Sequence, residues 1–169
     1  FNLVDLPLKK KKKKNSDYRA FRNKLNSIPN IKSVSRSMII PTDKSYTDNP
    51  FRLRNNTHTF FPVINRVDEQ FIPVYDIPLL AGQNFKAEMI RDTSFHYVIN
   101  DAARRMFGFK SPVDALGKEI GILSGPDQQT SNWGQIIGVT KDFHFQSLTE
   151  VIKPMVLIPS LSGYRHITI

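Results

Sequence analysis

The stretch from Trp133 to Pro154 constrains the fold of this chain more than any other part of its sequence. Its first half predicts a β-strand, because Ile136, Ile137 and Val139 are branched apolar residues of the kind that strands favour. Gly138 interrupts this run, and a glycine inside a strand pattern often marks a β-bulge or a close approach of another backbone segment. We therefore expect a buried strand with a local distortion at Gly138.

A polar corner follows this strand. The segment Lys141–Phe145 alternates polar and aromatic residues, and the spacing of Ser147 and Glu150 fits a capping box that opens a short helical turn. A strand, a sharp corner and a short helix in succession indicate a place where the chain crosses between two structural units. The residues that we expect at this corner are Gly138, Lys141, Asp142 and His144.

Length and composition indicate a folded chain of modest size. The 169 residues suffice for one domain or two small subdomains, and 40% hydrophobic residues can form a real core. The absence of cysteine excludes disulfides and thiolate chemistry, and fits an exported or a cytosolic bacterial protein equally well. No apolar run approaches the roughly 20 residues that a membrane-spanning helix needs, and no signal peptide is recognisable.

The net charge of +9 raises the possibility of a nucleic-acid-binding protein. Six of these charges belong to the run Lys9–Lys14, which leaves an ordinary +3 for the rest. A nucleic-acid surface would also interleave basic residues with stacking aromatics on one face, and no such stripe is present. We therefore expect no nucleic-acid partner. The lysine run is interpreted as a solvated loop or a cloning remnant, with a contact to anionic lipid or nucleic acid as the alternative.

The first third of the chain predicts a strand–helix–strand unit. Residues Asn2–Leu8 are expected to form a strand, and Ile31–Ile40 a second one. Between them, Ser16 or Asp17 is placed to cap a helix. The apolar residues that would share one face of this helix, at spacings of three and four, are Tyr18, Phe21, Leu25 and Ile28.

The middle and last thirds alternate short strands with loops. Thr42–His58 is polar and aperiodic, which predicts a long surface loop, and Asp68 could cap a short helix. Asn100 is expected to cap a helix over Asp101–Phe107, and Gly108 to end it in a left-handed conformation. The expected strands are Thr59–Val67, Ile77–Leu80, Tyr97–Ile99, Glu119–Leu123, Gly134–Thr140, and a final pair formed by Met155–Ile158 and Tyr164–Ile169.

Two residues of the corner could carry chemistry. Asp142 and His144 are two positions apart, so on an extended segment both side chains point to one side and could bind a metal or act as an acid–base pair. No third ligand lies nearby in the sequence, which favours a structural explanation: Asp142 would bond backbone groups while His144 packs beside Phe143 and Phe145. Gly117-Lys118 lacks the glycine spacing of a phosphate loop. We therefore expect no enzyme, no cofactor and no metal.

The order of several short motifs resembles one known family. Ile136-Ile137-Gly138-Val139, followed by Lys141–Leu148 and Ile152-Lys153-Pro154, is similar to the periplasmic core domain of MacB-type ABC-transporter permeases, the FtsX-like permease family. Gln83 stands where that family often has arginine, and Asp101 where it often has glutamate. Further matches, in family order, are Pro29–Ser35, Val67-Asp68, Leu79–Gly82, Asn84-Phe85, Val98–Ala103, Phe107-Gly108, Pro112 and Gly117-Lys118.

The resemblance implies an α+β fold with two subdomains. A membrane-proximal, porter-like strand–helix–strand subdomain would comprise residues 1–60 and 141–169, and a smaller mixed α/β subdomain residues 61–140. Membrane helices would flank the domain, since the chain starts at Phe1 and stops within an alternating pattern at Ile169. We expect the two subdomains to shift about the crossings between them.

The resemblance also implies a function. The domain would lie on the periplasmic face of the bacterial inner membrane, in a homodimeric transporter whose ATP-binding subunit or domain hydrolyses ATP. It would be non-catalytic and would couple that hydrolysis to efflux, lipoprotein release or regulation of a partner, such as a periplasmic adaptor, a lipoprotein or a cell-wall enzyme. The alternative is an extracytoplasmic ligand-sensing domain of a membrane receptor, which would require a closed pocket with convergent polar groups.

Overall fold

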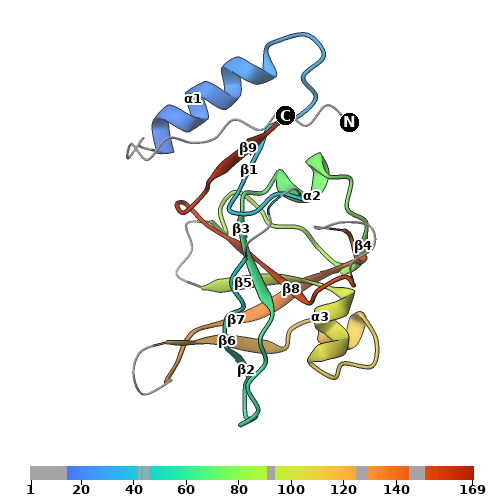
Figure 1. Ribbon diagram of the computed structural model, residues 1–169. Helices are drawn as coiled ribbons and strands as arrows, with labels where there is room; N and C mark the ends of the chain where they lie inside the picture. Colours follow the sequence, from blue (N-terminus) through green and yellow to red (C-terminus); the bar gives the residue numbers. More distant parts are fainter. Residues whose placement is uncertain (1–14, 42, 44–45, 91–93, 125–128, 145–150) are drawn as a thin grey trace.

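Short strands around one long strand dominate the computed structural model (Figure 1). It describes residues 15–41, 43, 46–90, 94–124, 129–144 and 151–169, so the expected strand Asn2–Leu8, the run Lys9–Lys14 and the capping box of Ser147 and Glu150 lie outside the described residues. The elements are, in chain order, α1 (Asn15–Asn26), β1 (Ser35–Ser37), β2 (Phe51–Leu53), β3 (Val63–Val67), α2 (Phe71–Val74), β4 (Leu79–Gly82), β5 (Phe95–Asn100), α3 (Asp101–Met106), the 3₁₀ helix η1 (Val113–Ala115), β6 (Glu119–Ser124), β7 (Gln129–Thr140), β8 (Met155–Pro159) and β9 (His166–Thr168).

The strands form one mixed sheet. Their order is β2-β6-β7-β5-β8-β3-β1-β9, and β4 pairs with β7 beside this path. The pairs β5–β7 and β3–β8 are parallel, and the remaining pairs are antiparallel. A mixed sheet with a few short helices confirms the predicted α+β class.

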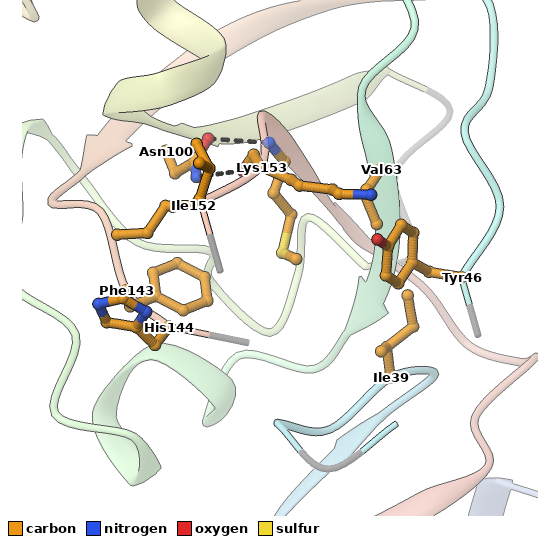
Figure 2. Close-up of a pocket in the computed structure, with 10 residues that line it drawn as sticks. Ile39, Tyr46, Val63, Asn100, Phe143, His144, Ile152 and Lys153 are labelled. Carbon is orange, nitrogen blue, oxygen red and sulfur yellow. Dashed lines mark hydrogen bonds between the residues drawn. The ribbon is translucent and has the colours of Figure 1, made fainter. Parts of the chain in front are cut away.

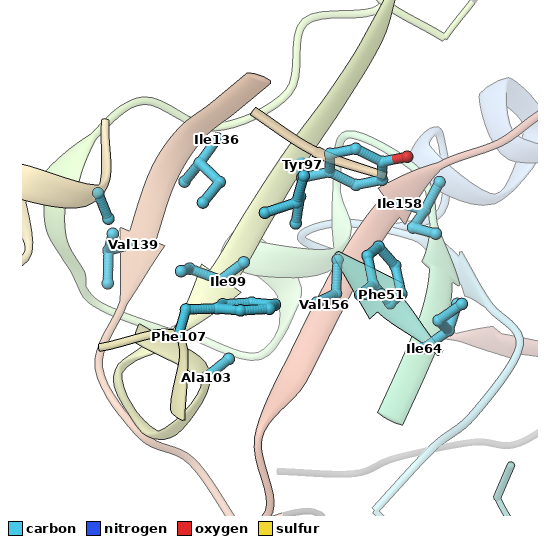
Figure 3. Packing of buried hydrophobic residues seen from close by; sticks show 12 residues of the cluster. Phe51, Ile64, Tyr97, Ile99, Ala103, Phe107, Ile136, Val139, Val156 and Ile158 are labelled. Atoms are coloured by element: carbon cyan, nitrogen blue, oxygen red, sulfur yellow. The ribbon is translucent and has the colours of Figure 1, made fainter. Parts of the chain in front are cut away.

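The largest part of the core lies between the sheet and α3 (Figure 3). Tyr97 and Ile99 of β5 project from the sheet beside Ile136 and Val139 of β7, and all four are fully buried. The ring of Phe51 meets that of Tyr97 edge to face, with centroids 5.9 Å apart. Aromatic rings bury large areas and dominate cores, so this contact ties β2 to the centre of the sheet.

The helix α3 begins and ends as its sequence signals predict. The Asn100 side chain accepts a hydrogen bond from the Ala103 backbone N–H, which is the expected N-cap. Gly108 has a φ of 83°, the left-handed conformation expected just beyond the helix end. Both predictions are confirmed.

Three predictions about the outer parts of the sheet are wrong. The expected loop Thr42–His58 contains β2, and Phe51 within it is fully buried. The strand expected over Ile31–Ile40 is confined to β1, three residues long. The two last strands do not pair with each other, because β8 lies between β3 and β5 while β9 pairs with β1.

The helix α1 lies at one end of the molecule, next to β1 and β9 (Figure 1). Tyr18 is buried in a small cluster with Val34 and Ile167. Two residues of the predicted apolar face are exposed instead, Phe21 to 39% and Ile28 to 47%. The helix is therefore confirmed, but only part of its apolar face is covered by the described residues.

The predicted division into residues 1–60 with 141–169 and residues 61–140 stays a prediction. Within the sheet, β3 of the second range pairs with β1 and β8 of the first range.

Among the described residues, none of the helices has the length and apolar character needed to cross a membrane.

Candidate functional site

The predicted distortion at Gly138 is present in β7. Its pairing with β5 shifts register between Tyr97, which faces Ile136, and Val98, which faces Gly138. A β-carbon placed on Gly138 would lie 2.4 Å from the backbone oxygen of Gln83, far inside van der Waals contact. Both expectations for this glycine, a bulge and a close backbone approach, are confirmed. The bulge lies close to the end of β7, which is followed by the corner that begins at Lys141.

Asp142 holds the corner against α3. One carboxylate oxygen accepts a hydrogen bond of 2.7 Å from the Ala102 backbone N–H, and the other lies 2.7 Å from a guanidinium nitrogen of Arg105. An acidic group at a helix N-terminus is stabilised by the unpaired N–H groups and the helix dipole. Asp142 therefore acts on backbone groups, as the structural explanation of this residue predicts. Lys141 is exposed, and its N–H donates to the Pro78 carbonyl.

His144 lies away from these contacts, at a small pocket (Figure 2). Phe143 is beside it, and across the pocket the ammonium group of Lys153 stands 4.3 Å from the ring centre of Tyr46. The pocket has a volume of about 20 Å³, enough for about one water molecule. Binding sites for small molecules usually exceed about 300 Å³, so this pocket does not support the receptor alternative.

The described residues of the corner do not bring a set of metal ligands together. Among residues 15–41, 43, 46–90, 94–124, 129–144 and 151–169, no three His, Cys, Asp or Glu side chains come close enough to hold a metal ion. Phe145, the other aromatic neighbour expected for His144, lies outside the described residues.

Asn100 connects the corner region to β8. Its amide oxygen accepts hydrogen bonds from the N–H groups of Ala103 and Met155, and its amide nitrogen donates to the Lys153 carbonyl. Figure 2 shows the bond from Asn100 to Lys153. The Asn100 side chain is almost fully buried, and its bonds from the Ala103 and Met155 N–H groups are made away from water. One amide thus fixes the end of β5, the start of α3 and the entry to β8.

A second polar cluster joins α1 to the sheet. The Asp68 carboxylate is 1% exposed and accepts hydrogen bonds from the side chains of Tyr18 and Ser35 and from the Arg36 N–H. Burial, the largest cause, raises its pKa to about 6, although the bonds from Ser35 and Arg36 act in the opposite direction. Next to it, Glu69 pairs with Arg22 of α1 at 2.5 Å. The predicted cap role of Asp68 survives only in part, through a bond of 3.2 Å from the N–H that precedes α2.

Comparison with known proteins agrees with this architecture. No protein-family model and no curated protein matches the chain. Among solved structures, the periplasmic region of MacB from Actinobacillus actinomycetemcomitans superimposes with a TM-score of 0.58 at 17% identity, over 89% of this chain and 62% of that one. The extracellular domain of the noncanonic ABC-type transporter YknZ from Gram-positive bacteria gives 0.59 at 15% identity, over 99% of this chain and 82% of that one.

The chain has the fold of a MacB-type periplasmic domain. It spans less than two thirds of the MacB region that it matches. The motifs that suggested this resemblance occupy connected places in the MacB-type fold: β7 and the corner lie beside α3, and the segment before β8 is bonded to Asn100.

The sequence did not reveal that Asp142 and Asp68 each lie at the centre of a polar cluster in this MacB-type fold. Asp68 and Tyr18 are 50 residues apart, and Asp142 and Ala102 are 40 apart, so no local pattern joins them. A usable signal was present for Asp68, since an acidic residue that directly follows a buried strand is itself often buried and then needs hydrogen-bond donors.

Proposed function

We propose that this chain is the extracytoplasmic domain of an ABC-transporter permease, on the periplasmic face of a bacterial inner membrane, and that it is non-catalytic. The supporting observation is the MacB-type fold combined with the position of its outer elements. Of the two solved structures compared above, one is described as the periplasmic region of MacB and the other as the extracellular domain of an ABC-type transporter. Because fold alone does not fix function, the proposal also depends on where the outer elements of the domain lie.

The outer elements α1 and β9 lie side by side at one end of the molecule (Figure 1). The strand β1, which follows α1, pairs with β9 over three residues, and Tyr18 of α1 packs against Ile167 of β9. A domain held between two membrane segments needs both connections on one face. In our proposal this end faces the membrane, and motion of the membrane helices enters the domain through α1 and β9.

The corner is the second part of the proposal. Gly138, Lys141, Asp142 and His144 would form the crossing through which the second subdomain follows that motion. ATP hydrolysis would take place on a cytoplasmic ATP-binding subunit or domain, and the domain would transmit it to efflux, lipoprotein release or a partner such as an adaptor, a lipoprotein or a cell-wall enzyme. A homodimeric transporter belongs to the same proposal.

Spin-label distances in the whole transporter test this proposal. The chain has no cysteine, so Val113→Cys and Leu161→Cys would place one exposed label in each predicted subdomain. We expect the distance distribution between them to change when nucleotide binds. The pair Val113→Cys and Leu80→Cys lies within residues 61–140 and should keep its distribution. Identical distributions for the first pair in both nucleotide states would defeat the coupling role.

A simpler test concerns the gene. Apolar stretches of about 20 residues on both sides of this segment, with an ATPase encoded alongside or fused, are expected for a permease. A different membrane architecture, such as a receptor kinase, would overturn the proposal and favour a sensor domain.

A further inference from the structure

Arg36 of β1 lies where the first helix and the last strand of the described chain meet. In the pairing of β1 with β9, its Cα stands opposite that of Ile167. Its guanidinium carbon is 3.4 Å from the ring centre of Tyr18, which belongs to α1, and 4.2 Å from that of Tyr164, which lies between β8 and β9. One side chain therefore contacts aromatic rings from opposite ends of the chain.

The two ring contacts are made by a largely buried cation. The Arg36 side chain is 13% exposed, and Tyr18 is 8% exposed. A guanidinium over an aromatic face is attracted by the ring quadrupole, and the attraction grows when water is excluded. Arg36 Nε stands 4.0 Å from the Asp68 carboxylate, which is longer than a hydrogen bond. The carboxylate thus attracts the charge, while the rings provide the close contacts with the guanidinium plane.

Both rings are held in place by their hydroxyl groups. Tyr18 Oη donates a hydrogen bond of 3.2 Å to the buried Asp68 carboxylate. The Tyr164 hydroxyl donates to the carbonyl of Ser160 at the start of the same connection. Either ring would lose a hydrogen bond if it swung away from Arg36. The side chain of Arg36 is therefore bound on one side to α1 and on the other to the connection that leads into β9.

We propose that Arg36 is a clamp that joins α1 to the connection between β8 and β9, so that these two outer parts move together. This deepens the proposed function, on which it rests for the source of the motion: membrane helices would act on α1 and β9. The clamp prevents α1 and β9 from separating. A displacement of either one then reaches the sheet through β1, which pairs with both β9 and β3.

A double-mutant cycle in the 169-residue chain measures the clamp. Tyr18→Leu and Tyr164→Leu each remove one ring, and loss of either ring frees Arg36 from the other. The two single changes should therefore overlap: the double variant should be about fivefold less destabilised, in its unfolding equilibrium constant, than the product of the single effects. In an Arg36→Met background, which keeps a long apolar side chain without the charge, the two effects should multiply.

The matched control pairs Tyr18→Leu with Phe60→Leu, an aromatic truncation beside Phe107 in the other part of the core. These two effects should multiply, because distant sites without shared partners act independently. Multiplying effects of Tyr18→Leu and Tyr164→Leu in the wild-type background would overturn the clamp. The same overlap in the Arg36→Met background would also overturn it, because the two rings would then be coupled without the guanidinium.

A second measurement uses the wild-type chain and so does not depend on a variant that folds. Protons that lie over the face of an aromatic ring are shifted upfield in the NMR spectrum by the ring current. The Nε–H and δ protons of Arg36 should therefore resonate upfield of those of the exposed Arg165. Equal positions for the two arginines would contradict the ring contacts and with them the clamp.

Spin labels in the whole transporter test the mechanical consequence. With labels at Asn23→Cys of α1 and at Arg165→Cys next to β9, both exposed positions, the distance distribution should be the same with and without nucleotide. In Arg36→Met it should change with nucleotide. A nucleotide-dependent distance in the wild type, or a constant one in Arg36→Met, would overturn the clamp. Failure of the proposed function has a different signature, a constant distance between Val113→Cys and Leu161→Cys, and leaves the double-mutant cycle as it is.

Discussion

The carboxylate of Asp142 accepts a hydrogen bond from the backbone N–H of Ala102, 40 residues earlier in the chain. This bond joins the corner after β7 to the first turn of α3. Asn100 bonds the next N–H of the same turn, so two side chains from different segments satisfy two of the four N–H groups that a helix start leaves unpaired. The helix is therefore part of the corner rather than a neighbour of it.

Asp142→Asn tests the contribution of this charge. The amide can still accept the Ala102 bond, but it loses the ion pair with Arg105 and the favourable charge at the helix start. Because the Arg105 side chain is 54% exposed, we expect a loss of only about 1 kcal/mol in the free energy of unfolding, measured by urea denaturation. Glu88→Gln, an exposed neutralisation elsewhere, is the control. A loss equal to that of the control would mean that Asp142 serves only through its hydrogen bond.

Gly138→Ala tests the close approach in β7. The new β-carbon would meet the Gln83 carbonyl oxygen at 2.4 Å, and the backbone of two paired strands would have to move apart. Overpacking of this kind costs about 1–3 kcal/mol or more.

Gly108→Ala is the matched comparison for that substitution. Its β-carbon meets nothing within 4 Å, so only the left-handed φ of 83° is penalised, at about 1 kcal/mol. Thermal unfolding should therefore rank Gly138→Ala below Gly108→Ala in stability, and the opposite order would contradict the contact with Gln83.

Asn100→Ala should be the most damaging of these substitutions. It removes the cap of α3, deprives the buried Met155 N–H of its bond to the Asn100 amide, and removes the amide bond to the Lys153 carbonyl. Loss of a cap costs about 1 kcal/mol and each unsatisfied buried group about 1–3 kcal/mol, so we expect a total of about 3 kcal/mol or more. Asn56→Ala, which removes one exposed bond to the His58 N–H, should cost much less by the same urea measurement.

Local signals were sufficient for part of this structure. The cap at Asn100, the left-handed Gly108 and the distortion at Gly138 each depend on residues within a few positions, and all three are confirmed. The expectation that Asp142 bonds backbone groups was also correct, although its partner Ala102 could not be named from the sequence.

Non-local pairing explains what the sequence could not reveal. Phe51 stands in a polar, turn-rich stretch, and its strand β2 pairs with β6, about 70 residues later, where Ile122 lies opposite Phe51. In the same way β9 follows β8 closely but pairs with β1, at the other end of the chain. The Asp68 cluster needs Tyr18 from α1, and no periodicity connects the two residues.

The pH dependence of global stability offers a last prediction. Unfolding releases Asp68 into water, so its pKa falls from about 6 in the folded chain towards 3.8. Between these values the folded chain binds more protons than the unfolded chain, and the stability that this group contributes is complete below the lower value and is lost as pH rises through about 6. Urea unfolding across this range should therefore show Asp68→Asn gaining stability relative to the wild type as pH rises. A difference between the two proteins that stays constant would mean that Asp68 has the same proton affinity in the folded and unfolded chains.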